Sequence, residues 1–100
     1  MIRNNTFSSS GDHGIKIASS VSIVVDNNTL DSNTDNGLYV SSADDITIKS
    51  NTVSDNNAGI YISTSDDPIL SSNTIESQTT FGVYIIESER VKFKSNIVKN

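Results

Sequence analysis

Carboxylate side chains recur at a nearly constant interval in the second half of the sequence, at Asp44-Asp45, Asp66-Asp67 and Glu89. Proteins bind Ca²⁺ through about 6–8 oxygen ligands, with Asp and Glu carboxylates prominent among them. Carboxylates held close together repel one another unless a cation lies among them. If the chain stacks these positions, Asp44, Asp66 and Glu89 are candidate ligands of Ca²⁺, the one cofactor that the sequence suggests.

These five residues, which we call the acidic corner, also fit a simpler interpretation as a solvated turn. Asp is favoured in turns because its side chain hydrogen-bonds to the neighbouring backbone. Arg90 directly follows Glu89 and could neutralise the corner. The cation site and the solvated turn therefore both remain open.

Three tyrosines recur at a similar interval, at Tyr39, Tyr61 and Tyr84, and Lys16 stands one interval before Tyr39. Tyrosines on a flat face can receive sugar rings by apolar contact while their hydroxyls hydrogen-bond to the sugar. The three tyrosines are therefore candidate glycan-binding residues, with a polysaccharide as candidate partner. Stacked aromatic rings also stabilise a parallel sheet without a ligand, so a structural role is the alternative.

The chain has a single histidine, His13. It lies in Gly11-Asp12-His13-Gly14, a stretch of turn-forming residues, so the simpler interpretation is a solvent-exposed turn histidine. The sequence has no cysteine, which excludes a thiolate nucleophile, a disulfide and a cysteine zinc site. It also lacks a glycine-rich phosphate loop, a nucleophile elbow and a cluster of metal-ligating histidines.

Composition narrows the class of partner. Ser (18), Asn (12) and Thr (9) make up 39 of the 100 residues, so small hydrogen-bonding side chains dominate the surface. The net charge of −5 repels phosphate backbones and argues against nucleic acid or an anionic membrane as partner. No apolar run approaches the roughly 20 residues of a membrane span, and the N-terminal residues lack the apolar region of a signal peptide.

An internal repeat of 22–23 residues positions all of these side chains. Its first marker is an Asn two residues before an apolar side chain, at Asn5, Asn28, Asn51, Asn73 and Asn96. Its second marker is a Gly that opens an apolar-x-apolar triplet, at Gly14, Gly37, Gly59 and Gly82. A further apolar-x-apolar triplet ends three residues before each repeat Asn after the first.

The apolar residues of each period alternate with a period of two, which predicts strands, and clusters of Ser, Asp, Asn and Gly between them predict turns. Three short strands cannot bury their apolar side chains alone, but stacked copies can pair in parallel about 4.8 Å apart. We therefore predict an all-β fold, a single-stranded parallel β-helix with three sides and about four coils of 22–23 residues. Parallel crossovers are nearly always right-handed, which predicts a right-handed coil.

Stacking turns each repeat position into a column of neighbours. The predicted core columns contain Phe7, Leu30, Val53, Ile75 and Val98; Ile15, Ile17, Leu38, Val40, Ile60, Ile62, Val83 and Ile85; and Ile23, Val25, Ile46, Ile48, Leu70, Val91 and Phe93. The repeat Asn residues are predicted to form a hydrogen-bonded ladder, because a buried turn needs its polar groups satisfied. The repeat Gly residues are predicted to adopt a backbone conformation that a side chain would oppose.

The strings Asn-Thr-apolar, Gly-Ile-Tyr-Ile-Ser and apolar-x-apolar-x-x-Asn resemble the right-handed parallel β-helix repeat of the pectin-lyase-like superfamily over nearly all 100 residues. The most similar branch is the generic β-helix region of bacterial and archaeal surface proteins and of periplasmic accessory proteins of nitrous oxide reductase. The superfamily includes polygalacturonases, lyases, epimerases, tailspikes, adhesins and non-catalytic scaffolds, so the fold alone does not decide the function.

Two candidate sites resemble parts of enzymes in that superfamily. The segment Gly11–Ile17 resembles the Gly-His-Gly-Ile-x-Ile segment around the catalytic histidine of polygalacturonases, which makes His13 the catalytic candidate. The carboxylate motifs that precede this segment in that family are missing here, since only 12 residues precede His13, and inverting hydrolysis needs a pair of carboxyl groups. Gly37-Leu38-Tyr39-Val40 also stands where the family has Arg-Ile-Lys. Pectate lyases hold Ca²⁺ through aspartates on their β-helix, as the acidic corner would.

We expect one domain, residues 1–100, that is a segment of a longer β-helix without caps. Its expected partners are adjoining coils of a parent chain, or a second copy bound through the open strand edges. The first functional hypothesis is a non-catalytic scaffold segment, structural or glycan-binding, of a larger surface or secreted protein in an extracellular, cell-surface or periplasmic setting. The alternative is an incomplete part of a polysaccharide lyase or glycoside hydrolase.

Overall fold

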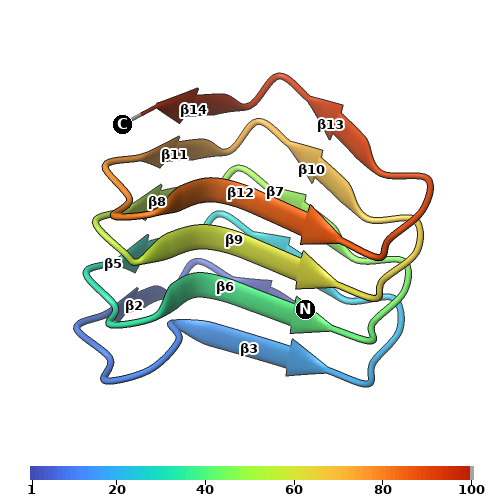
Figure 1. Cartoon of the computed structure of the whole chain (residues 1–100), viewed down its shortest axis with the longest axis horizontal. Helices are drawn as coiled ribbons and strands as arrows, with labels where there is room; N and C mark the ends of the chain where they lie inside the picture. Colours follow the sequence, from blue (N-terminus) through green and yellow to red (C-terminus); the bar gives the residue numbers. More distant parts are fainter. Residues whose placement is uncertain (100) are drawn as a thin grey trace.

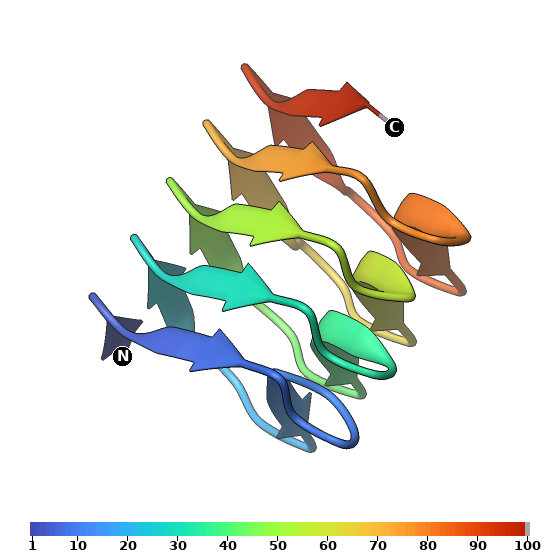
Figure 2. The same cartoon turned by 90° about the vertical axis from the view of Figure 1, so that its left-hand side faces the viewer.

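The computed structural model describes residues 1–99, and this range contains fourteen strands and no helix. The chain winds as a coil whose successive turns lie one above another (Figure 1). The two termini lie at opposite ends of the stack (Figure 2). Because residues 1–99 contain no helix, they include none that could cross a membrane.

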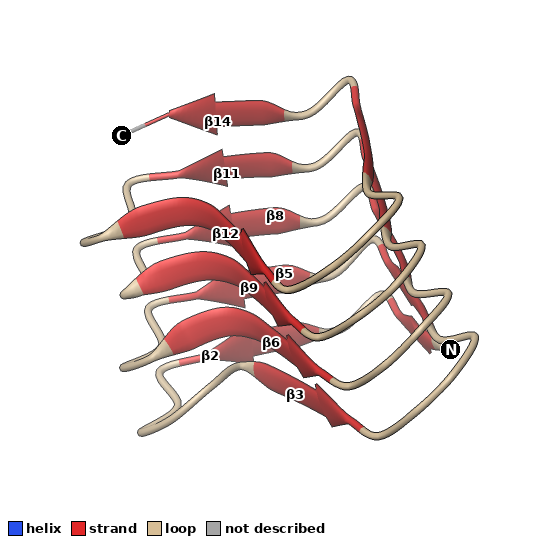
Figure 3. Ribbon diagram, turned by 45° about the vertical axis from the view of Figure 1, so that its right-hand side comes forward, coloured by secondary structure: helices blue, strands red, loops and turns tan. Residues whose placement is uncertain are grey.

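The strands form three parallel sheets, one on each side of the coil (Figure 3). Sheet A contains β1 (Ile2–Arg3), β4 (Val24–Asp26), β7 (Thr47–Lys49), β10 (Ile69–Ser71) and β13 (Lys92–Lys94). Sheet B contains β2 (Thr6–Ser8), β5 (Thr29–Asp31), β8 (Thr52–Ser54), β11 (Thr74–Glu76) and β14 (Ile97–Lys99). Sheet C contains β3 (Ile15–Ala18), β6 (Asn36–Ser41), β9 (Ala58–Ser63) and β12 (Phe81–Ile86). The predicted three-sided parallel β-helix is confirmed.

The strand register follows the sequence repeat, so equivalent residues of successive coils face one another. In sheet B, for example, Leu30 pairs with Val53, and Val53 pairs with Ile75. All three side chains are fully buried, whereas the Thr before each of them points outward. Burying an aliphatic side chain of this size contributes about 1.5–3 kcal/mol, so the core between the sheets is the main source of stability.

The predicted core is confirmed in the middle coils and is wrong at one end. Phe93 and Val98 are 49% and 45% exposed. They lie on β13 and β14, the outermost strands of sheets A and B in the described residues, so no strand covers them on one side. Phe7, Ile23, Val83, Ile85 and Val91 pack against the core but are only partly buried.

Each coil turns its corners through residues with positive φ, and none of these is a glycine. Ser, Asn and Asp supply most of them, because short polar side chains tolerate the left-handed region better than bulky ones do. The four columns are Asn4, Asn27, Ser50, Ser72 and Ser95; Ser9, Ser32, Asp55 and Ser77; Ser19, Ser42, Thr64 and Glu87; and Ser22, Asp45, Asp67 and Arg90. The columns fix where the chain leaves one sheet and enters the next.

The prediction of an unusual backbone conformation at the repeat glycines is wrong, since no glycine has a positive φ. The glycines are instead places of close packing. A Cβ atom on Gly59 would lie 2.5 Å from the carbonyl oxygen of Gly82 and 2.8 Å from Cγ2 of Ile75. A Cβ atom on Gly14 would lie 2.7 Å from the carbonyl oxygen of Gly37. The column thus excludes side chains because neighbouring backbone and core side chains fill the space.

Candidate functional site

The predicted asparagine ladder is confirmed at the corner between sheets A and B. Oδ1 of Asn51 accepts hydrogen bonds from the backbone N–H and the side-chain amide of Asn28, at 2.9 and 3.1 Å. Nδ2 of Asn51 donates to the backbone carbonyl of Val25 at 3.0 Å. The pattern recurs from Asn5 to Asn96, and the middle members are almost fully buried. Each amide therefore joins two coils.

A second ladder, which the sequence analysis missed, occupies the corner between sheets B and C. The backbone N–H of Asn33 donates to Oδ1 of Asn56, and the backbone N–H of Asn56 donates to Oε1 of Gln78, both at 2.9 Å. All three side chains are buried. The spacing of these residues by 23 and 22 positions matches the repeat and could have indicated the column. The column was not recognised because its third member is Gln and not Asn.

The corner between sheets C and A uses serine hydroxyls in the same way. The backbone N–H of Ala43 donates to Oγ of Ser65 at 3.1 Å, and that of Ser65 donates to Oγ of Ser88 at 3.0 Å. In residues 1–99, no buried side-chain nitrogen or oxygen lacks a hydrogen-bond partner. The polar corner residues thus hold successive coils together.

The acidic corner follows directly after the serine column and also joins coils through side-chain oxygens, but here the backbone N–H donates to the preceding coil, whereas in the serine column it donates to the next one. Oδ1 of Asp44 accepts a hydrogen bond from the backbone N–H of Asp66 at 2.8 Å. Oδ1 of Asp66 accepts one from the backbone N–H of Glu89 at 3.2 Å. The side chains of Asp44, Asp66 and Glu89, with those of Thr64, Glu87 and Ser88, line an open groove of about 630 Å³. In Asp44 and in Asp66, one carboxylate oxygen is already used in a hydrogen bond between coils.

Arg90 lies at the same corner and neutralises part of it. Its guanidinium binds both carboxylate oxygens of Asp67, at 2.7 and 3.1 Å, and approaches Glu89 at 3.2 Å and Asp66 at 3.7 Å. The hydrogen bond from Arg90 holds the pKa of Asp67 below its ordinary value. Asp67 in turn raises the pKa of Arg90, so both groups are charged at neutral pH.

His13 is not the solvent-exposed turn histidine of the simpler interpretation, because its side chain is only 15% exposed. Its ring stacks on Tyr39 with the centroids 4.7 Å apart. Nδ1 lies 3.3 Å from the backbone nitrogen and 3.2 Å from Nδ2 of Asn36, one coil away. Both partners are N–H donors, so Nδ1 presents its lone pair and the proton of the neutral ring lies on Nε2.

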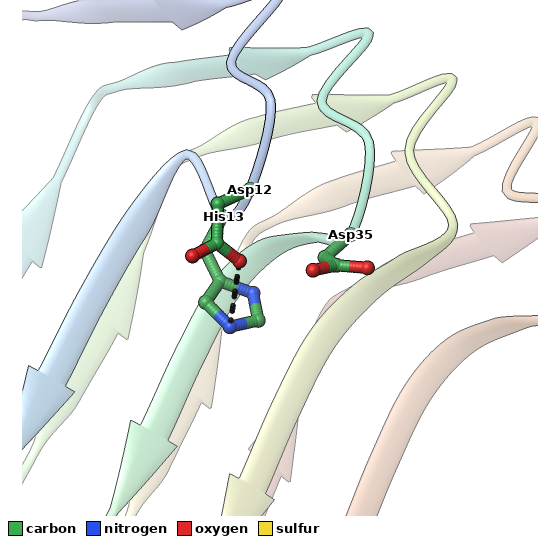
Figure 4. A group of neighbouring side chains, drawn as sticks. All are labelled: Asp12, His13 and Asp35. Atoms are coloured by element: carbon green, nitrogen blue, oxygen red, sulfur yellow. Dashed lines mark ion pairs between the residues drawn. The ribbon is translucent and has the colours of Figure 1, made fainter.

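Two carboxylates lie beside this ring (Figure 4). Nε2 of His13 is 3.4 Å from Oδ1 of Asp12, and one ligand atom each from Asp12, His13 and Asp35 all lie within 4.8 Å of one another. In residues 1–99, Asp44, Asp66 and Glu89 do not form such a group. Sequence reasoning missed the grouping, although Asp12 and Asp35 are one repeat apart.

The tautomer limits what this cluster can do. Because Nε2 carries the proton, it cannot accept a second one or bind a metal ion in the neutral ring. A general base or a metal ligand at this position would require His13 to break its contacts with Asn36. A catalytic role for His13 stays a prediction, and the geometry favours a histidine that joins two coils.

The tyrosines form a continuous stack on the outer face of sheet C. The rings of Tyr39 and Tyr61 are 5.2 Å apart and those of Tyr61 and Tyr84 are 5.1 Å apart, with interplanar angles of 13° and 15°. His13 continues the stack beyond Tyr39, whereas Lys16, the register partner of Tyr39, places Nζ 5.9 Å from the Tyr39 centroid. The flat ring faces therefore cover one another, and the ring edges face outward.

Comparison with known proteins supports the architecture. The family model described as the right-handed β-helix region matches residues 1–100. The chain belongs to the right-handed β-helix family. This membership confirms the predicted handedness and is consistent with the pectin-lyase-like superfamily. Searches of curated proteins and of solved structures found no match to this β-helix chain.

Proposed function

We propose that this β-helix is a non-catalytic scaffold segment of a larger surface or secreted protein. One observation carries the proposal: polar side chains that could do chemistry use their acceptor atoms to join neighbouring coils. This is true of Nδ1 of His13, Oδ1 of Asp44 and Oδ1 of Asp66. Each of these contacts between coils takes up an acceptor atom that a general base or nucleophile would otherwise turn toward a substrate.

The alternative, an incomplete part of a polysaccharide lyase or glycoside hydrolase, has weaker support. The inverting hydrolysis that the polygalacturonase-like segment around His13 would imply needs two carboxyl groups about 6.5–9.5 Å apart, to leave room for water. The ligand oxygens of Asp12 and Asp35, the carboxylates beside His13, lie within 4.8 Å of each other. The proton on Nε2 also leaves His13 without a free basic nitrogen.

A turnover assay separates the two. The purified chain is incubated with pectin, polygalacturonate and neutral polysaccharides, and reducing and unsaturated sugar ends are measured. We expect no release above background. Release that disappears in both His13→Ala and Asp12→Asn, with the variants melting as the wild type does, would establish the enzyme and overturn the scaffold.

Glycan binding is the second candidate, supported by the exposed row of tyrosine edges and hydroxyls together with Ser41 and Ser63, which pair in the next column of sheet C. Sugars usually pack on ring faces, and here the faces cover one another. We therefore expect no change in tyrosine fluorescence on titration with polysaccharides. Saturable quenching that Tyr61→Ala removes would show that the scaffold binds glycans and is not purely structural.

The proposed protein partner is another β-helix coil, from a parent chain or a second copy. The end of the stack formed by β12, β13 and β14 exposes Phe81, Phe93, Ile97 and Val98 by 45–55%. Exposed apolar side chains beside open strand edges favour association. Sedimentation velocity should show concentration-dependent association of the isolated chain, and Val98→Asp should reduce it. A monomer at every concentration would contradict the proposal.

A further inference from the structure

The tyrosine stack holds three oxidisable rings in fixed pairs along the coil axis. Tyr61 pairs in register with Tyr39 on one side and with Tyr84 on the other. Its ring centroid lies 5.2 Å from that of Tyr39 and 5.1 Å from that of Tyr84. Parallel pairing on both sides of β9 maintains these spacings, so the rings are held in contact by the sheet.

The three rings are also accessible. Each tyrosine is partly exposed on the outer face of sheet C. The chain has no Cys and no Trp, so the tyrosines are its most readily oxidised aromatic side chains. Its single Met takes up oxygen on oxidation and does not join residues. The reaction that fits two adjacent phenols is one-electron oxidation followed by coupling of the rings.

We propose that Tyr61 is a site of oxidative cross-linking, which couples to Tyr39 or Tyr84 when a haem peroxidase and hydrogen peroxide supply the oxidising equivalents. Each phenol gives up one electron and its hydroxyl proton and becomes a phenoxyl radical. The two radicals form one carbon–carbon bond between ring carbons ortho to the oxygens. Each of these carbons then releases its hydrogen as a proton while its oxygen regains one. The pair loses two hydrogen atoms, and one hydrogen peroxide is reduced to two waters.

The product joins neighbouring coils covalently across the outside of the solenoid. It closes a loop of 22 residues for Tyr39 with Tyr61, or 23 residues for Tyr61 with Tyr84. A closed loop of this kind restricts the unfolded chain and stabilises the folded one. The scaffold would therefore gain resistance to unfolding under oxidising conditions.

The test is oxidation of the folded chain at low concentration by a haem peroxidase and hydrogen peroxide. We expect dityrosine fluorescence in a product that stays monomeric in a denaturing gel and is two hydrogens lighter by mass. Trypsin cuts after Lys49 and Arg90, so a Tyr61–Tyr84 link lies within one peptide and a Tyr39–Tyr61 link joins two.

Conservative variants provide the decisive controls. Tyr61→Phe keeps the stacked ring but should abolish the intramolecular link, since Tyr39 and Tyr84 are two coils, or roughly 10 Å, apart. Tyr39→Phe should retain the link and confine it to Tyr61 with Tyr84. An equal yield of intramolecular link in Tyr61→Phe, or only intermolecular dityrosine from the wild-type chain, would overturn the proposal.

Discussion

Oδ1 of Asn73 accepts two hydrogen bonds from Asn51, one from its backbone N–H at 2.9 Å and one from its side-chain amide at 3.0 Å. Asn51 is 1% exposed and serves the coil on its other side in the same way. Asn51→Ala should therefore leave buried polar groups unpaired and lower the free energy of unfolding by about 1–3 kcal/mol. Chemical denaturation measures the loss.

The matched control is Asn5→Ala, at the exposed end of the same ladder. Its loss should be clearly smaller, because water can replace the missing amide there. Equal midpoints for the wild type and Asn51→Ala would mean that the ladder contributes nothing to stability.

Gly59→Ala tests whether close packing explains the glycine column. The new Cβ would meet the carbonyl oxygen of Gly82 at 2.5 Å, and overpacking of this kind costs about 1–3 kcal/mol. Gly11→Ala is the control, since nothing lies within 4 Å of its Cβ position. The first variant should melt lower and the second should not. Similar melting of both would refute the packing explanation.

The ion pair of Asp67 and Arg90 predicts a dependence of stability on acid. The pKa of Asp67 is lowered in the folded chain, so its contribution is present above the ordinary value of 3.8 and is lost as the pH falls through the folded value. Asp67→Asn should remove this part of the pH dependence in melting curves recorded from neutral pH to below 3.8. Arg90→Gln should have the same effect, and the double variant should add little more. If the loss of stability at acid pH is the same in both single variants as in the wild type, the ion pair is not maintained in solution.

Calcium should change the melting temperature little or not at all. A cation that binds only the folded chain stabilises it by mass action. Asp44 and Asp66 each already accept a backbone N–H, and Arg90 competes for the corner. Thermal melts in Ca²⁺ and in chelator should therefore coincide. A rise in Ca²⁺ that Asp66→Asn removes would establish the metal site.

The repeat made most of the fold predictable, because a spacing of 22–23 residues between Asn markers specifies both the coil length and the strand register. It also places Asp12 one coil from Asp35 and His13 one coil from Asn36. The stacking of His13 on Tyr39 could not be predicted in this way, since the register partner of Tyr39 is Lys16. Side-chain direction at a turn depends on local backbone angles that the repeat does not encode.

The glycines show a second limit of sequence reasoning. Glycine permits both unusual backbone angles and close approach, and the sequence alone does not distinguish the two. The structure assigns the unusual angles to Ser, Asn and Asp corners and the close approach to glycine. The exposure of Phe93 and Val98 likewise depends on which strands have a neighbour, and a column of apolar residues does not reveal it.

Residue-resolved hydrogen exchange tests most directly the claim that polar corner side chains are structural acceptors between coils. The backbone N–H groups of Asn51 and Asn56 lie at turns, yet they donate to Oδ1 of Asn73 and Oε1 of Gln78. They should exchange as slowly as the amides of the central strands β8 and β9, whereas those of β14 exchange first. Exchange of the Asn51 and Asn56 amides at the rate of unprotected turn amides, while β8 and β9 stay protected, would contradict the account.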